Sequence, residues 1–127
     1  MRIDRCRRGF TLIELLVVMA ILAVLLSIAA PRYFESVARA KETALRTDLR
    51  LLREAIDKHR ADTGRLPDSL QALAAARYLR SVPPDPFTDS AATWVPSPHP
   101  DGATPGVYDV HSGAPGEGRD GSAYSSW

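Results

Sequence analysis

The sequence from Phe10 to Ala30 is apolar along nearly its whole length, but one of its few polar side chains is a carboxylate. A helix of about 21 residues spans the roughly 30 Å hydrocarbon core of a membrane. The polar exceptions are Thr11, Glu14 and Ser27. An ionised side chain at membrane depth costs roughly 2.5–3.5 kcal/mol on insertion scales, so Glu14 is expected to be functional and to need a positive partner.

A basic segment precedes this apolar run. Residues 1–9 carry four arginines against one aspartate, whereas the rest of the chain carries 12 basic against 14 acidic residues. Positive charge beside an apolar span favours the cytoplasmic side, so we predict that residues 1–9 are cytoplasmic and that the C-terminal part is exported. The single cysteine, Cys6, lies in this segment, so the exported part can form no disulfide. No basic region remains that would suit nucleic acid.

Three interpretations of the apolar run compete. A cleaved secretory signal would use the small residues Ser27-Ile28-Ala29, but the run is long for such a signal, contains a carboxylate and is followed at once by Pro31. A plain membrane anchor gives Glu14 no purpose. We favour the third interpretation, a span that first lies in the membrane and later forms the core of a polymer.

Beyond Pro31 the apolar residues recur at three- and four-residue steps, as on one face of a helix. This stripe comprises Phe34, Val37, Ala38, Leu45, Leu49, Leu52 and Ile56. The pattern predicts a helix from near Phe10 to near Ala61, about 50 residues or roughly 75 Å long, which ends at Thr63-Gly64. Because Pro31 lacks a backbone N–H, a kink or local unwinding is expected near residues 27–31.

Acidic and basic residues lie four positions apart on the faces of this helix outside the apolar stripe. Such acid-first pairs weakly stabilise a helix and are typical of a solvated surface. The pairs are Glu35 with Arg39, Glu42 with Arg46, and Glu54 with Lys58.

A second, shorter helix is predicted after Pro67. Asp68 is expected to cap it, with Gln71 completing a capping box. Leu70, Leu73 and Ala74 would form its inner face as far as about Arg77, after which the proline-rich segment from Pro83 to Phe87 is expected to be extended and stiff.

Two short strands are predicted in the remaining sequence, at Thr93 to Val95 and at Gly106 to Val110. From Ser112 onward the chain is rich in glycine, serine and proline, and we expect the terminal Trp127 to pin this loop. The fold class is therefore α+β, a long N-terminal helix packed on a small C-terminal domain with a short helix and a small antiparallel sheet.

The run Gly9-Phe10-Thr11-Leu12-Ile13-Glu14, directly after a basic segment, resembles the processing site of type IV prepilins and of the pseudopilins of type II secretion systems. The order of elements is most similar to the major, G-type pseudopilins. The weaker C-terminal resemblance lies in Leu66-Pro67, the Pro83 to Phe87 segment and Gly106-Val107-Tyr108-Asp109-Val110 before a glycine-rich loop with a closing tryptophan.

This resemblance implies a cleaved leader (1–9), a membrane and filament-core helix (10–30), its amphipathic continuation (31–62) and a small periplasmic region (63–127). A prepilin peptidase would cut between Gly9 and Phe10 and methylate the new amine of Phe10. Glu14 would serve the amine of a neighbouring subunit, and Pro31 would let the helix loosen during assembly. The implied partners are other copies in a homopolymer, minor pseudopilins and the assembly platform of the bacterial inner membrane.

The resemblance also implies a calcium ion in the C-terminal loop, bound by carboxylates and backbone carbonyls. Asp109 and Asp120 are the nearest candidates, with Glu117 a third. This chain departs from the family pattern, because its loop is shorter and has Arg119-Asp120-Gly121 where a richer acidic cluster is common. A metal-free turn built by Asp120-Gly121 is therefore the alternative.

The sequence shows no catalytic constellation, so we expect no enzyme. His59, His99 and His111 are widely separated, and a zinc cluster of His111, Asp109 and Asp120 is disfavoured against solvated side chains. Two functions stay open: a structural subunit of a secretion filament, or a type IV pilin or minor pseudopilin in adhesion, DNA uptake or filament-tip initiation. The absence of a C-terminal cysteine pair argues against an adhesive pilin, and Glu14 argues against a tip subunit.

Overall fold

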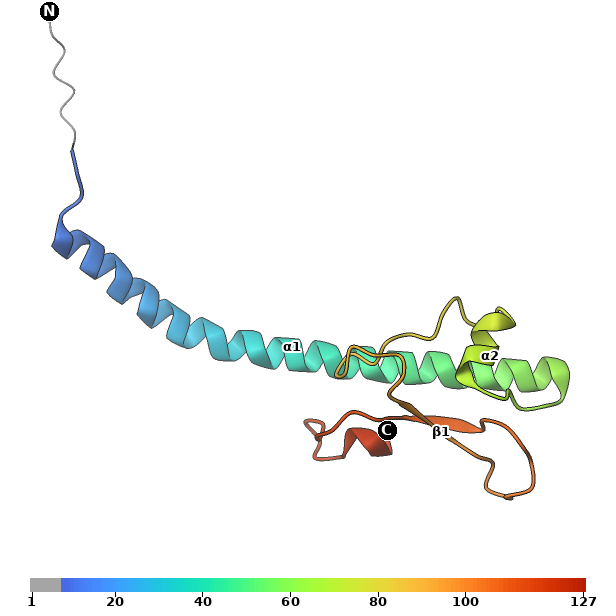
Figure 1. The fold of residues 1–127 in the computed structure, drawn as a ribbon. Helices are drawn as coiled ribbons and strands as arrows, with labels where there is room; N and C mark the ends of the chain where they lie inside the picture. Colours follow the sequence, from blue (N-terminus) through green and yellow to red (C-terminus); the bar gives the residue numbers. More distant parts are fainter. Residues whose placement is uncertain (1–7) are drawn as a thin grey trace, which may run out of the picture. The chain divides into compact units, whose positions relative to one another are not determined.

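The computed structural model describes residues 8–127, so the predicted leader up to Arg7, with Cys6, lies outside the described residues. Its elements are helices α1 (Leu12–Thr63) and α2 (Leu70–Ala75), strands β1 (Trp94–Ser97) and β2 (Asp109–Ser112), and a final 3-10 helix η1 (Tyr124–Ser126) (Figure 1). These elements confirm the α+β class. The chain divides into two compact units, one up to Ala38 and one from Arg39.

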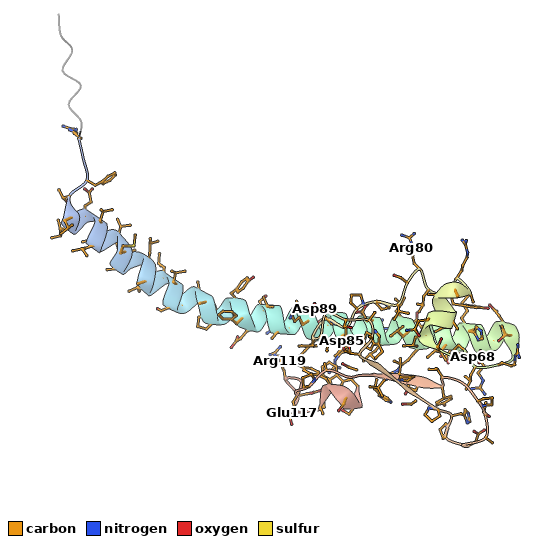
Figure 2. All side chains as sticks on the ribbon, viewed as in Figure 1. Asp68, Arg80, Asp85, Asp89, Glu117 and Arg119 are labelled. Carbon is orange, nitrogen blue, oxygen red and sulfur yellow. The ribbon has the colours of Figure 1, made fainter. Side chains whose placement is uncertain are left out.

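In the first unit, α1 exposes its large apolar side chains on all sides. Within residues 8–127, α1 is the one helix long and apolar enough to cross a membrane, and its most apolar stretch is entirely exposed. Figure 2 shows side chains projecting around this part of the helix. Phe10 and the large apolar residues from Leu12 to Ile28 are 45–79% exposed. A helix that is apolar all round needs lipid or other protein to cover it.

Pro31 lies inside α1, and the helix continues through it to Thr63. The expected local unwinding is therefore not seen, while the predicted kink stays a prediction. The helix ends as expected, because Gly64 adopts a positive φ of 71° and its N–H donates to Arg60 O at 2.8 Å. A glycine in this conformation terminates a helix without steric cost.

In the second unit, α1 buries one stripe against the C-terminal elements. The buried residues, each at most 5% exposed, are Leu45, Leu49, Leu52, Ala55 and Ile56. The N-terminal part of the predicted stripe is not core, because Phe34 is 68% exposed and Ala38 is exposed as well. Within residues 8–127, the first α1 residue of the buried core is Leu45.

Helix α2 is capped by Ser69, so the predicted cap at Asp68 is wrong. The Ser69 hydroxyl accepts the N–H of Ala72 at 3.1 Å, which leaves no place for Gln71 in a capping box. The helix ends at Ala75, before the predicted Arg77. Arg77 itself has a φ of 64°, and the N–H of Tyr78 donates to Leu73 O at 2.9 Å, which closes a Schellman-type turn. The predicted inner face is confirmed, with Leu70 and Leu73 buried.

Strands β1 and β2 form a two-stranded antiparallel sheet in which Trp94 faces Ser112 and Ser97 faces Asp109. Both strands start later than predicted. Residues 106–107 are held elsewhere, because the N–H of Val107 donates to Pro67 O at 2.8 Å. Gly106 lies so close to the connection between α1 and α2 that a Cβ there would meet Leu66 Cβ at 2.7 Å.

The proline-rich segment is a turn stabilised by a buried carboxylate. Asp85 is fully buried; its Oδ2 accepts the Ser112 hydroxyl at 2.5 Å and its Oδ1 accepts the N–H of Phe87 at 2.8 Å. Figure 2 labels Asp85 beside α1. Partial burial, and then the charge of Asp85, raise the pKa of Asp48 on α1. The expectation of a wholly extended segment is wrong, since the Asp89 N–H also turns back to Asp85 O at 2.8 Å.

Candidate processing site and end loop

The peptide bond between Gly9 and Phe10 lies in an exposed segment without regular structure, just before α1. Phe10 is 79% exposed. A Cβ added at Gly9 would meet nothing within 4 Å, and its φ lies outside the left-handed region. The fold therefore does not require glycine at position 9, and a peptidase could reach this bond without unfolding any element.

Glu14 and Thr11 form a reciprocal capping box at the start of α1. The N–H of Thr11 donates to Glu14 Oε2 at 3.4 Å, and the N–H of Glu14 donates to Thr11 Oγ1 at 3.2 Å. Both bonds satisfy backbone donors that a helix start leaves free, and the carboxylate also suits the positive end of the helix dipole. This role of Thr11 was not predicted from the sequence, although the spacing Thr-x-x-Glu is typical of a capping box.

The capping box places the carboxylate next to the candidate processing bond. Thr11, whose N–H the carboxylate accepts, directly follows Phe10. Cleavage after Gly9 would free the Phe10 amine one residue away from that N–H. The structure thus brings the predicted residues Gly9, Phe10 and Glu14 into one short region.

The candidate calcium ligand Asp109 is already paired with arginine. Its Oδ1 accepts the Nε–H of Arg53 at 2.7 Å and its own strand's Val110 N–H at 2.7 Å. Its other oxygen lies 3.6 Å from Nε2 of His111. The guanidinium of Arg53 also donates to Val110 O at 3.0 Å, so α1 and β2 are joined through this pair.

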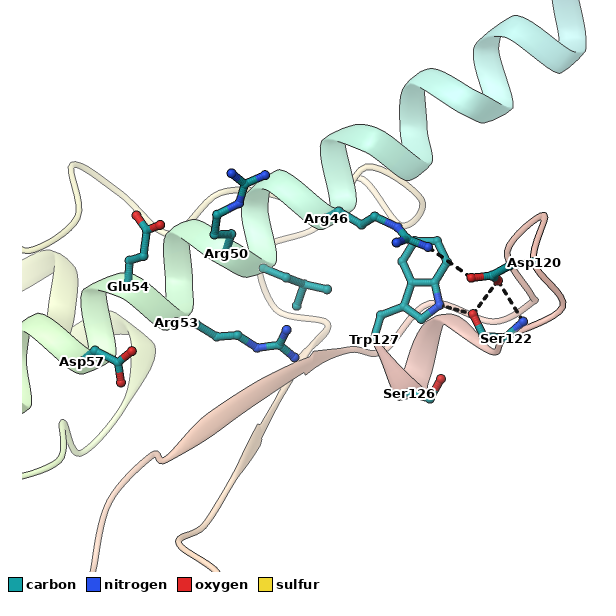
Figure 3. A pocket seen from close by; sticks show the side chains of 10 residues that line it. Arg46, Arg50, Arg53, Glu54, Asp57, Asp120, Ser122, Ser126 and Trp127 are labelled. Carbon is teal, nitrogen blue, oxygen red and sulfur yellow. Dashed lines mark hydrogen bonds and ion pairs between the residues drawn. The ribbon is translucent and has the colours of Figure 1, made fainter.

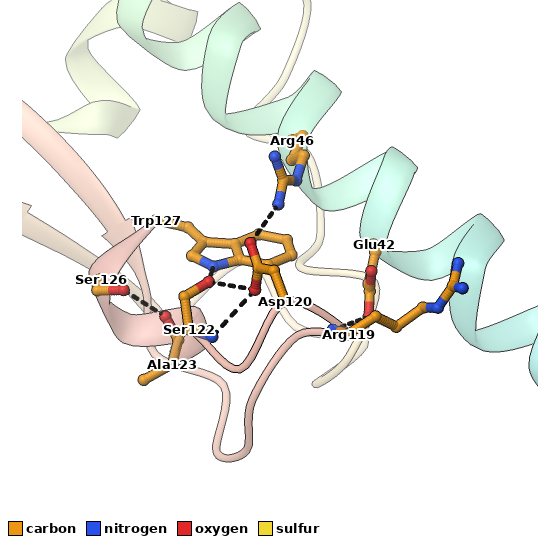
Figure 4. A network of polar contacts seen from close by, with 8 residues as sticks. All are labelled: Glu42, Arg46, Arg119, Asp120, Ser122, Ala123, Ser126 and Trp127. Carbon is orange, nitrogen blue, oxygen red and sulfur yellow. Dashed lines mark hydrogen bonds and ion pairs between the residues drawn. The ribbon is translucent and has the colours of Figure 1, made fainter.

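The second candidate, Asp120, also has a donor on each of its carboxylate oxygens (Figure 4). Its Oδ1 accepts the N–H of Ser122 at 3.0 Å and the Ser122 hydroxyl at 2.5 Å, while Oδ2 accepts Nη2 of Arg46 at 3.2 Å. The hydrogen bonds from Ser122 are the main cause that lowers the pKa of Asp120, and the charge of Arg46 adds to them against partial desolvation.

These carboxylates do not fit a calcium site. Calcium takes six to eight oxygen ligands, usually with several free carboxylate oxygens. Within residues 8–127, no three side chains of the His, Cys, Asp and Glu types lie close enough together to hold a metal ion. Glu117 is exposed, and the structure does not bring it to Asp109 and Asp120. The bonds around Asp120 instead fit the alternative, a turn built without metal.

The three histidines are also dispersed, and each has a local partner. His59 Nδ1 lies 3.0 Å from Arg65 O, His99 Nδ1 lies 3.0 Å from the carboxylate of Asp101, and His111 Nδ1 lies 2.8 Å from Trp127 O. Within residues 8–127, His111, Asp109 and Asp120 form no group that could hold a metal ion, so the zinc cluster considered from the sequence is not assembled.

The C-terminal segment is fixed to the rest of the second unit, as predicted. We call residues 113–127 the end loop. The Tyr124 ring stacks on Phe87 with centroids 4.2 Å apart, and within the loop the Trp127 indole N–H donates to Ser122 Oγ at 2.5 Å. A groove between α1 and this loop is lined by side chains of both signs, among them Arg46, Arg50, Arg53, Asp57 and Asp120 (Figure 3).

Residues 4–30 match the family model described as the prokaryotic N-terminal methylation motif. The type II secretion system core protein G of Dickeya chrysanthemi is 34% identical over 83 residues, covering 65% of this chain and 54% of that protein, or about half its length. The protein of the same name from Klebsiella pneumoniae is 32% identical over 109 residues, covering 73% of this chain and 78% of that protein.

A type IV pilin is also similar to this chain. The type IV major pilin protein PilA of Myxococcus xanthus is 38% identical over 79 residues, which cover 60% of this chain and 36% of that protein. No solved structure matches the chain significantly. The Klebsiella match covers 78% of that relative's length, and the N-terminal methylation motif, residues 4–30, contains Gly9, Phe10 and Glu14. The chain therefore belongs to the type II secretion system core protein G family.

Proposed function

We propose that this chain is a major pseudopilin, a structural subunit that polymerises into a periplasmic filament driving type II protein secretion. The observation that carries the proposal is that the first part of α1 is apolar on all sides and entirely exposed, and that the Glu14 carboxylate caps its first turn. In the membrane, lipid covers this surface. In the filament, the same surface of neighbouring copies replaces lipid.

Before assembly the subunit crosses the inner membrane once. The arginines of the leader hold its N-terminus on the cytoplasmic side, and the region after α1 is periplasmic. A prepilin peptidase cuts the exposed bond after Gly9 and methylates the Phe10 amine. The cut removes the +3 charge of residues 1–9 and leaves one positive charge at Phe10.

Glu14 then acts as the register residue of assembly. A buried carboxylate and a buried amine are each expensive alone, and pairing them offsets much of that cost. In the described chain one carboxylate oxygen caps the Thr11 N–H, which leaves Oε1 for the amine of a neighbouring copy. The ion pair between the Glu14 carboxylate and the Phe10 amine of a neighbouring copy would thus fix the axial position at which a subunit is added to the filament. Minor pseudopilins and the inner-membrane assembly platform are the further partners of this process.

Secretion by a host strain tests this function. We expect that deleting the gene for this chain abolishes release of type II exoproteins into the medium, and that the full-length chain restores it. Exoproteins would accumulate in the periplasm of the deletion strain. Loss of surface pili or of DNA uptake, with secretion intact, would support instead the type IV pilin function that the Myxococcus relative represents.

A further inference from the structure

The end loop is joined to α1 through Arg46, which forms an ion pair with the carboxylate of Asp120. The guanidinium of Arg46 lies 4.1 Å from the centroid of the Trp127 ring and donates to Asp120 at 3.2 Å. Figure 4 shows Arg46 reaching from α1 toward Asp120 beside the indole ring. One guanidinium therefore makes both a cation–π contact and an ion pair.

The residues around this arginine form a connected set. Ser122 bonds to Asp120 with both its N–H and its hydroxyl, and the hydroxyl oxygen also accepts the indole N–H of Trp127. A Cβ at Gly118 would lie 2.3 Å from Trp127 Cζ2, so only glycine leaves room for the ring there. The loop is thus shaped around the Trp127 ring that Arg46 covers.

A second bond attaches the loop one helical turn earlier on α1. The N–H of Arg119 donates to Glu42 Oε1 at 3.0 Å. The sequence had paired Glu42 with Arg46 along the helix, but within residues 8–127 this pair forms no salt bridge; each residue contacts the end loop instead. The Glu42 carboxylate accepts a backbone N–H of the end loop, and the Arg46 guanidinium donates to a carboxylate of the same loop. Each of the two charged side chains of α1 therefore has a complementary partner in the end loop.

We propose that Arg46 takes the place of a divalent cation in closing the end loop, so that this subunit folds and keeps its loop ordered independently of calcium. Both oxygens of Asp120 already accept N–H or O–H donors, so a calcium ion would compete with Arg46 and Ser122 for them. Arginine is always protonated and supplies its charge in a fixed plane, whatever the concentration of free ions.

Thermal unfolding of the full-length chain in detergent micelles tests this proposal, followed by tryptophan fluorescence. We expect the wild-type midpoint to be the same, within about 1 °C, in millimolar calcium chloride and in EDTA. Arg46→Gln is expected to lower the unfolding midpoint by about 4–8 °C, because it removes both the ion pair with Asp120 and the cation–π contact with Trp127.

Arg50→Gln is the matched control, since Arg50 lies one turn further along the same helix and forms no ion pair within residues 8–127. We expect its midpoint to change by less than about 2 °C. Asp120→Asn combined with Arg46→Gln should cost clearly less than the sum of the single changes, because the two residues are partners. A rise of several degrees on adding calcium to the wild type, or equal midpoints for Arg46→Gln and Arg50→Gln, would overturn the proposal.

Discussion

Glu14→Ala is expected to leave membrane insertion and leader cleavage intact and to reduce filament assembly by roughly two to four orders of magnitude. The reason is the charge left behind. If the carboxylate is absent, the amine of a neighbouring copy is buried without a partner, at a cost of about 3–5 kcal/mol. Each 1.4 kcal/mol is a factor of ten in an equilibrium constant. Filaments sheared from cells and collected by ultracentrifugation measure assembly, and the size of the subunit on a blot reports cleavage.

Two further variants separate the charge of Glu14 from its place in the capping box. Glu14→Gln keeps a side chain that can cap the Thr11 N–H but removes the charge, whereas Thr11→Ala keeps the charge and removes half of the box. We expect Glu14→Gln to assemble as poorly as Glu14→Ala, and Thr11→Ala to assemble nearly as well as the wild type. The reverse pattern would show that helix capping, and not ion pairing, is what assembly needs.

Leu52→Ala is expected to destabilise the second unit by about 2–5 kcal/mol, the usual cost of a large-to-small change in a core. Leu52 is completely buried at the centre of the stripe that α1 contributes. For a small domain this loss lowers the unfolding midpoint by roughly 10 °C or more. Thermal unfolding followed by the fluorescence of Trp94, which lies in the same core, measures the change.

The neighbouring leucine provides the control for this substitution. Leu51 has the same side chain on the same helix but is 46% exposed. Leu51→Ala is expected to cost less than about 1 kcal/mol, because little apolar surface returns to water. Equal losses for the two variants would mean that the buried face of α1 is not the one described.

The sequence predicted the elements that depend on local patterns. The apolar run, the three- and four-residue spacing and Gly64 were enough to place α1 and its end within two residues. The expectation that Trp127 would pin the end loop is also confirmed, because its ring contacts Arg46 on α1 as well as Ser122 and Tyr124 within the loop.

The errors arise where distant segments meet. Gly106 and Val107 carry a strand-like pattern, but Val107 bonds to Pro67, and no local pattern shows that. Asp68 and Ser69 are both residue types that cap helices well. Which of them is the N-cap depends on the residue at which α2 begins, and tertiary packing sets that residue.

The ion pairs of the second unit also could not be predicted from local sequence spacing alone. Glu42 and Arg46 have the spacing of a helical ion pair, yet each bonds to the end loop instead. A pair at this spacing is worth only about 0.2–0.5 kcal/mol on a helix, so tertiary partners readily replace it. For the same reason the carboxylate of Asp120 could not be assigned from sequence to a cation or to an arginine.

The N-terminus of the mature subunit tests the central claim most directly. Mass spectrometry of the chain purified from a host with an active prepilin peptidase should find a polypeptide that begins at Phe10 and carries one methyl group on its amine. A chain that restores secretion while retaining its arginine-rich leader, or that begins after Ala29, would contradict the account, because no amine would then be available beside Glu14.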